Sequence, residues 1–436
     1  MSFPRRVALA LALPLVAALA TFVLRSEPAA AAPPPAEAPG KFMGTAQCVK
    51  CHENGMGGRA ADALPALKEV PIWQKRDQHA FAFLRLQDKR PPNPRWRSKV
   101  SSEDIMANLT KKGGDDGDDD DDDDDADVPE ASKSPRCLTC HGIMVQQLGA
   151  PGWLPKGAEL RVSENRALQQ GYKASEGVSC DGCHGPASGW VESHVTDHWA
   201  PNEWKKRQDP KDPAAASRKL WEEKGIYYSK DLVLWARQCV RCHLQLDAEL
   251  VKAEHPDLKP FELWDQVGRV PPHWRDYAKA QDAAELPGAG PTHAARLWQV
   301  GQAVALDDAL AQVVARTGKK KVAKKQVEAA IERAQSHWTV LRHALAAQPS
   351  LKDAAAALGA AMTKLAGAKD KAERNAAAKA AIAALGPLPY ALATVAVSKD
   401  QVKAIKAALE GDADAKQKGN KDVAELSLVP LGKALE

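Results

Sequence analysis

The chain has 436 residues, eight cysteines and a formal net charge of +4 at pH 7. This length is sufficient for two or three domains. Eleven aspartates lie between positions 115 and 127, so the remainder of the chain is clearly basic, with a formal charge of +15. No nucleic-acid-binding pattern accompanies this charge, and we expect no nucleic-acid partner.

Residues 1–25 are predicted to be an export signal. Arg5 and Arg6 precede an apolar stretch of 18 residues at positions 7–24, as in a secretory signal peptide. This length is also at the limit for a spanning helix, so an uncleaved N-terminal membrane anchor is the alternative. Either arrangement places the rest of the chain in the periplasm, and no other stretch is predicted to span a bilayer. The Ala/Pro-rich residues 26–44 are predicted to be a flexible linker.

All eight cysteines belong to four copies of one motif, Cys-x-x-Cys-His. Within a helical turn, the two thiols lie on one side and can add to the vinyl groups of one haem, and the histidine becomes the proximal iron ligand. The sequence therefore predicts four covalently bound haem c groups, each with its iron. In chain order the motifs are Cys48-x-x-Cys51-His52, Cys137-x-x-Cys140-His141, Cys180-x-x-Cys183-His184 and Cys239-x-x-Cys242-His243.

Other uses of paired cysteines explain this pattern less well. Two Cys₄ zinc ribbons would use four Cys-x-x-Cys pairs, but zinc gives no reason for a histidine after each pair. A thioredoxin-like redox pair normally occurs once, near a βαβ pattern. Structural disulfides are possible in an exported protein, yet they also leave the four histidines unexplained.

Residues 45–290 are predicted to be a haem domain of short helices and loops. Ten of the twelve tryptophans lie there, and we expect their large apolar surfaces to pack against porphyrins. An acidic insertion at residues 113–130 interrupts this region. Its run of aspartates cannot contribute to a core and is predicted to be a disordered, solvated loop.

Residues 291–436 differ in character, because they lack cysteine and are rich in alanine. Apolar residues recur at helical spacing, for example at Val327, Ile331, Ala334 and Trp338. This periodicity predicts a bundle of five to seven helices with lysine-rich outer faces. The whole chain is therefore expected to be mainly α, with a multihaem cytochrome core followed by a C-terminal helical bundle.

Sixth iron ligands must come from histidines outside the motifs. A second histidine closes the iron and suits it to electron transfer, whereas its absence leaves a site open to a small molecule. Spacing alone does not assign these ligands. The eight candidates are His79, His194, His198, His255, His273, His293, His337 and His343, of which the last two are the weaker because they lie in the cysteine-free helices.

The segment from Glu176 to Pro186, followed by His194, resembles the third haem site of the cytochrome c-554 family. These tetrahaem cytochromes accept electrons from hydroxylamine oxidoreductase. The order of motifs is similar too, since a Trp73 to His79-Ala segment separates the first motif from the second. The resemblance covers roughly residues 45–275, so the acidic insertion and the C-terminal helices are departures from the family.

The resemblance implies a ligand set. It pairs His194 with the iron of His52, and His79 with the iron of His184. The iron of His243 takes a downstream histidine, either His255 or His273, and the His255-Pro-x-Leu element favours the former. The family's second haem is five-coordinate, which would leave the iron of His141 open unless His198 or His273 closes it.

Two functions follow from these expectations. The first is electron transfer in the periplasm between redox-partner proteins, such as other cytochromes, a quinol dehydrogenase or an oxidoreductase. The alternative is an enzyme that reduces or oxidises nitric oxide, nitrite or hydroxylamine at an open iron on His141. We favour the carrier and assign no catalytic residue. A scaffold role for the C-terminal helices is a weaker third interpretation.

Overall fold

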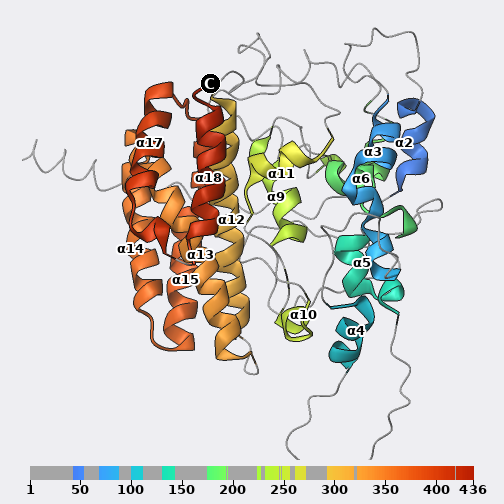
Figure 1. Ribbon diagram of the computed structural model, residues 1–436, viewed down its shortest axis with the longest axis horizontal. Coiled ribbons are helices and arrows are strands. Elements are labelled where there is room, and N and C mark those ends of the chain that lie inside the picture. Colours follow the sequence, from blue (N-terminus) through green and yellow to red (C-terminus); the bar gives the residue numbers. More distant parts are fainter. Residues whose placement is uncertain are drawn as a thin grey trace, which may run out of the picture. The chain divides into compact units, whose positions relative to one another are not determined.

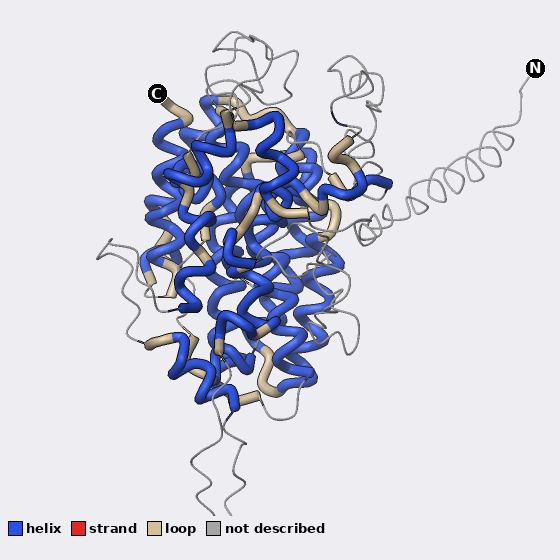
Figure 2. The backbone as a smooth tube through the Cα atoms, turned by 90° about the vertical axis from the view of Figure 1, so that its right-hand side faces the viewer, coloured by secondary structure: helices blue, strands red, loops and turns tan. Residues whose placement is uncertain are grey.

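The chain is mainly α-helical, as the sequence predicts, and the described residues contain no β-strand (Figures 1 and 2). The predicted export signal, nearly all of the linker, the acidic insertion up to position 129, and the candidates His198 and His273 lie outside the described residues. The computed structural model describes residues 43–53, 68–87, 100–110, 130–142, 174–192, 194, 223–226, 231–244, 246, 248–255, 261–271, 292–318, 322–417 and 419–436.

Each of the four motifs forms the end of a helix whose last residue is the motif histidine. Gly142 and Gly185 follow two of these histidines, and Gly185 has a φ of 93°, a conformation that glycine adopts without strain. The helices are α2 (Thr45–His52), α5 (Pro135–His141), α6 (Cys180–His184) and α9 (Leu232–His243).

Short helices and 3₁₀ turns connect the motif helices, which agrees with the predicted character of this region. They bury two small apolar clusters, one around Phe83, Met106 and Leu138 and another around Ile105 and Leu250. The connecting elements are α3 (Glu69–Arg76), η1 (Gln78–Phe81), η2 (Phe83–Gln87), α4 (Ser102–Thr110), η4 (Ala131–Lys133), η5 (Ala174–Glu176), η6 (Ala187–Gly189), α10 (Ala248–Lys252) and α11 (Leu263–Arg269).

The C-terminal region is a helical bundle (Figure 1). Its helices end or bend where the sequence carries glycine or proline, as at Gly318, Pro349 and Gly411. Its elements are α12 (His293–Gly318), α13 (Lys324–Ala346), η9 (Pro349–Leu351), α14 (Lys352–Gly367), α15 (Lys371–Leu385), α16 (Leu388–Thr394), α17 (Lys399–Gly411), η10 (Asp414–Lys416) and α18 (Lys421–Lys433).

The long helix α12 is the centre of this bundle and is buried on nearly all sides. It packs against α13, α15, α16 and α18. Its buried polar side chains donate hydrogen bonds to backbone carbonyls of neighbouring segments: Gln299 to Leu392 at 2.7 Å, and Arg316 to Gln326 at 2.8 Å. Such hydrogen bonds offset part of the cost of burying polar side chains on a helix that is covered all round.

The core of the bundle continues into the last motif helix. All described residues belong to one compact unit, residues 35–436, and α9 and α11 both pack against α12. Leu232, Val233 and Ala236 of α9 share a single apolar cluster with the bundle helices. An ion pair between Arg237 and Asp307, 3.4 Å apart, joins α9 and α12 within this contact. The helices on either side of the predicted boundary at residue 290 therefore share one core.

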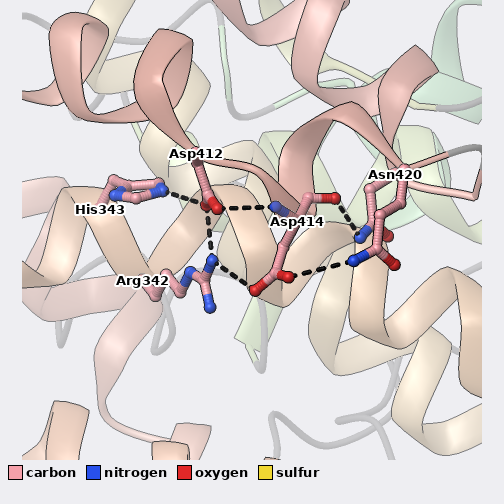
Figure 3. Close-up of polar contacts among 6 residues, drawn as sticks. Arg342, His343, Asp412, Asp414 and Asn420 are labelled. Carbon is pink, nitrogen blue, oxygen red and sulfur yellow. Dashed lines mark hydrogen bonds and ion pairs between the residues drawn. The ribbon is translucent and has the colours of Figure 1, made fainter.

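A polar cluster within the bundle involves one of the candidate histidines (Figure 3). The Asp412 carboxylate accepts hydrogen bonds from Arg342 at 2.5 Å and from His343 at 2.7 Å, and Arg342 also reaches Asp414 at 3.0 Å. Burial opposes ionisation of Asp412, but its hydrogen bonds to Arg342 and His343 outweigh this and lower its pKa to about 2. His343 therefore has a structural role between α13 and the end of α17.

One described stretch, Lys371–Thr394, is long and apolar enough to cross a membrane when judged by length and composition. The sequence pattern itself predicts no span beyond the N-terminal segment. In the structure this stretch comprises α15 and α16, which pack against α12.

The close contact between α11 and α12 predicts that a glycine-to-alanine substitution in α12 destabilises the protein. A Cβ atom at Gly301 would lie 2.6 Å from the Leu263 Cβ, so Gly301→Ala should destabilise the protein by about 1–3 kcal/mol despite alanine's helix propensity. Chemical denaturation followed by far-ultraviolet circular dichroism measures this change.

The matched control is Gly359→Ala in α14, where the nearest atom to the new Cβ is on the Trp338 ring at 3.4 Å. This variant should be stabilised by about 0.5–1 kcal/mol, because alanine restricts the unfolded chain. Equal stabilisation by both substitutions would contradict the close packing of α11 on α12.

Candidate haem-binding site

The structure brings the four motifs together. Helix α2 contacts α6, and α6 contacts α9, where the Arg241 guanidinium donates a hydrogen bond to the Gly182 carbonyl at 2.8 Å. The thiols of Cys48 and Cys180 lie within hydrogen-bonding reach of each other. The thiols of Cys140 and Cys242 form a second such pair. Motifs that are far apart in the sequence are therefore neighbours in space.

A buried carboxylate ties the first motif to the third. Asp181, inside the third motif, is fully buried and accepts hydrogen bonds from the backbone N–H groups of Met43, at 2.7 Å, and Gly44, at 3.3 Å. The adjacent Glu176 carboxylate accepts the N–H of Thr45 at 2.8 Å. Because these N–H groups open α2, two acidic side chains from the segment of the third motif fix the start of the first motif helix. Sequence analysis did not identify either role.

His52 and His194 form the first histidine pair. Their ring centroids lie 6.3 Å apart, and their planes differ by 17°. The Nδ1 of His52 is 2.8 Å from a Glu69 carboxylate oxygen, and the Nδ1 of His194 is 2.6 Å from the Val191 carbonyl. Metal-binding histidines commonly donate one ring N–H in this way, which leaves Nε2 for the metal.

The separation of this pair fits a shared metal atom. A metal bonded to the Nε2 atoms of two imidazoles at about 2 Å each separates the ring centroids by about 6 Å. The pair therefore agrees in geometry with the pairing of His194 and the iron of His52 that the resemblance implies. Trp190, buried at 5.2 Å from the His194 ring, packs edge-on against it and limits its rotation.

His79 lies beside a different motif from the one that the resemblance implies. Its ring centroid is 6.1 Å from that of His243 in the fourth motif, with the planes at 74°. The Nδ1 of His79 is 2.9 Å from the Asp77 carboxylate. The ring of His243 also faces Phe261, 6.1 Å away. The His79 ring thus lies beside the fourth motif, while the expected partner His184 is half-buried at the end of α6.

His141, in the second motif, is held by a similar hydrogen bond. Its Nδ1 donates to the Ala82 carbonyl at 2.9 Å. Burial lowers the pKa of His141, and the charges of His255 and Arg85 lower it further. His255 follows α10 and donates its backbone N–H to Leu250 at 2.9 Å. The candidate that the resemblance assigns to the fourth iron therefore acts electrostatically on the second motif.

Burial favours neutral imidazoles at most of these positions. It lowers the pKa of His243 to about 4 and lowers the pKa of His194. Neutral rings are the form that binds a metal. At His79 burial also acts to lower the pKa, but the hydrogen bond and charge of Asp77 outweigh it and raise the pKa above its usual value.

The described residues do not assemble a site for a bare metal ion. They contain no group of three or more His, Cys, Asp or Glu side chains that could hold one. A structural zinc ribbon requires four such ligands. A haem iron, in contrast, takes one or two protein ligands.

The described side chains fit a haem. Seven of the eight thiols are partly buried, and Cys183 is exposed. On α9, the buried Nε and Nη1 atoms of Arg237 and the Nε of Arg241 have no hydrogen-bond partner among the described residues. Buried guanidinium nitrogens without a partner are costly, and carboxylates such as haem propionates are strong partners for them.

Comparison of the chain with protein-family models, with curated proteins and with solved structures found no match in any of the three. The assignment of the site therefore depends on the residues of this chain.

The neighbouring thiols allow haem attachment to be distinguished from disulfides. We expect no alkylatable cysteine in the denatured mature protein, with or without a reductant, because thioether bonds to haem resist reduction. Alkylation with mass spectrometry measures this. If thiols appear only after reduction, the pairs Cys48–Cys180 and Cys140–Cys242 are disulfides instead.

Proposed function

We propose that the protein is a periplasmic tetrahaem c-type cytochrome that transfers electrons between redox-partner proteins. The observation that carries this proposal is the His52–His194 pair, with both Nδ1 atoms hydrogen-bonded and the ring centroids 6.3 Å apart, beside a complete haem-attachment motif. Two axial histidines close an iron against small molecules and suit it to electron transfer.

The side chains of the protein would contribute attachment, orientation and electrostatics. The eight motif thiols would anchor four haems, and His52, His141, His184 and His243 would each bind one iron. Bound haem supplies a reversible one-electron change of the iron. Glu69 and the carbonyls of Val191 and Ala82 hold three of the imidazoles in fixed orientations. Ligand identity and burial then set the potentials.

Close packing of the motifs supports transfer from one haem to the next. The first motif contacts the third, the third contacts the fourth, and the fourth lies beside the second. Export to the periplasm, with the N-terminal segment either cleaved or retained as an anchor, is part of the proposal, because covalent haem attachment is expected on that side of the membrane. Other cytochromes, a quinol dehydrogenase or an oxidoreductase are the proposed partners.

The alternative function is chemistry on a small nitrogen compound at an open iron on His141. One observation weakens it, because the charge of His255 acts on His141, so a second histidine is near the second motif. We therefore favour the carrier over the enzyme.

The axial pair predicts the effect of removing His194. His194→Ala should leave four haems per chain but convert one iron from low-spin to high-spin, because its sixth ligand is lost. Pyridine-haemochrome assay and electron paramagnetic resonance measure the two quantities. His343→Ala is the matched control and should leave the spin states unchanged, since Asp412 holds that ring in the bundle. Two or fewer haems in the wild-type chain would refute the proposed function.

Removal of His255 tests the choice between carrier and enzyme. If His255 closes the second iron, His255→Ala adds one high-spin iron and one cyanide-binding site relative to the wild type. Optical titration with cyanide counts these sites. Stoichiometric cyanide or nitric oxide binding by the wild type, unchanged in His255→Ala, would instead favour an open iron on His141.

A further inference from the structure

We propose that His79 is the second axial ligand of the iron held by His243, so that η1 and α9 bind one haem between them. This inference rests on the proposed function and deepens it. It differs from the pairing that the resemblance implies, in which His79 serves the third motif.

The separation of the two rings is compatible with a shared metal. Their centroids lie 6.1 Å apart, close to the 6.3 Å of the His52–His194 pair. Direct packing of two rings also occurs at about 4.5–7 Å, so the distance alone does not distinguish ring packing from binding of a shared metal. The hydrogen bond at Nδ1 adds the second argument, because Asp77 at 2.9 Å leaves Nε2 as the nitrogen that His79 can offer.

The main chain of His79 is held by hydrogen bonds of its own, in addition to the one at its ring. Its N–H donates to Asp77 at 2.9 Å, and its carbonyl accepts the N–H of Val178 at 2.9 Å. The Trp73 indole N–H donates to the Val178 carbonyl at 2.9 Å, which closes a second link to the same segment. The chain that leads into the third motif thus holds the backbone of η1, while the His79 ring lies beside the fourth motif.

A glycine makes this close approach possible. Gly177 has a φ of 70°, and a Cβ atom there would lie 2.5 Å from the His79 carbonyl oxygen. Because of this positive φ and this close approach, a larger residue fits here only if the backbone shifts. Gly177 is therefore a positioning residue for His79.

His243 is fixed from the opposite side by the bundle. It is the last residue of α9, whose Leu232, Val233 and Ala236 lie in the core shared with α12. Together these contacts give both rings of the pair a rigid support, as a fixed coordination geometry requires.

The proposal is tested by counting affected irons in double variants of the haem-loaded full chain. His79→Ala alone should add one high-spin iron. His79→Ala combined with His243→Ala should still affect one iron, because both ligands belong to it. His79→Ala combined with His184→Ala should affect two. Electron paramagnetic resonance gives the spin count, and pyridine-haemochrome assay gives the haem content.

The opposite pattern would overturn the proposal. If His79→Ala with His243→Ala affects two irons, and His79→Ala with His184→Ala affects one, His79 is a ligand of the third haem instead. An unchanged electron paramagnetic resonance spectrum in His79→Ala would show that the His79 and His243 rings are in ordinary packing contact. If His243→Ala prevents attachment at the fourth motif, the three-haem protein should gain no further high-spin iron on His79→Ala, and a gain would refute the pairing. A wild-type chain without haem would refute the proposed function itself.

The ring planes provide an independent signature. Axial imidazoles with nearly parallel planes give a rhombic low-spin signal, whereas nearly perpendicular planes give a strongly anisotropic one. The 17° and 74° angles therefore predict different signals for the first and fourth haems. His79→Ala should remove the anisotropic signal and His194→Ala the rhombic one. Loss of the rhombic signal in His79→Ala would contradict the assignment.

Discussion

Hydrogen bonds at Nδ1 determine which nitrogen each histidine can offer to a metal. In His52, His79, His141 and His194 this atom is already engaged, by carboxylates or by backbone carbonyls. The remaining nitrogen, Nε2, is then the available ligand atom in every case. This constraint is needed to interpret the distances between rings. A centroid separation of about 6 Å is compatible with a shared metal only when the Nε2 atoms can face that metal.

The two halves of the chain differ in the size of their apolar clusters. The C-terminal bundle buries a large continuous set of aliphatic side chains around α12. Apart from the α9 and α11 side chains that join the bundle core, the described residues of the motif-bearing region bury small clusters, such as that of Phe83, Met106 and Leu138. Under the proposed function, covalently held porphyrins would add apolar surface to this region. Helix α9 belongs to both systems.

Sequence reasoning identified the helical class, the motif positions and the terminal bundle, because each has a local signature. The arrangement of the histidines had no such signature. The position of His79 depends on contacts of its main chain with Gly177 and Val178, about a hundred residues away, and no spacing rule links them. The membership of α9 in the bundle core was not predicted, because residues 45–290 were assigned to a separate haem domain. No local pattern in the sequence indicates the roles of Glu69, Asp77 and Asp181, because these roles come from tertiary contacts.

The burial of α9 has a consequence for biogenesis under the proposed function. Cys239 is packed against the bundle core, and the Leu232, Val233 and Ala236 side chains beside it are buried. An attachment enzyme needs both thiols of a motif within its reach. Haem would therefore be joined to the fourth motif more readily while α9 is still undocked, and closure of the C-terminal helices over α9 would be a late step of maturation.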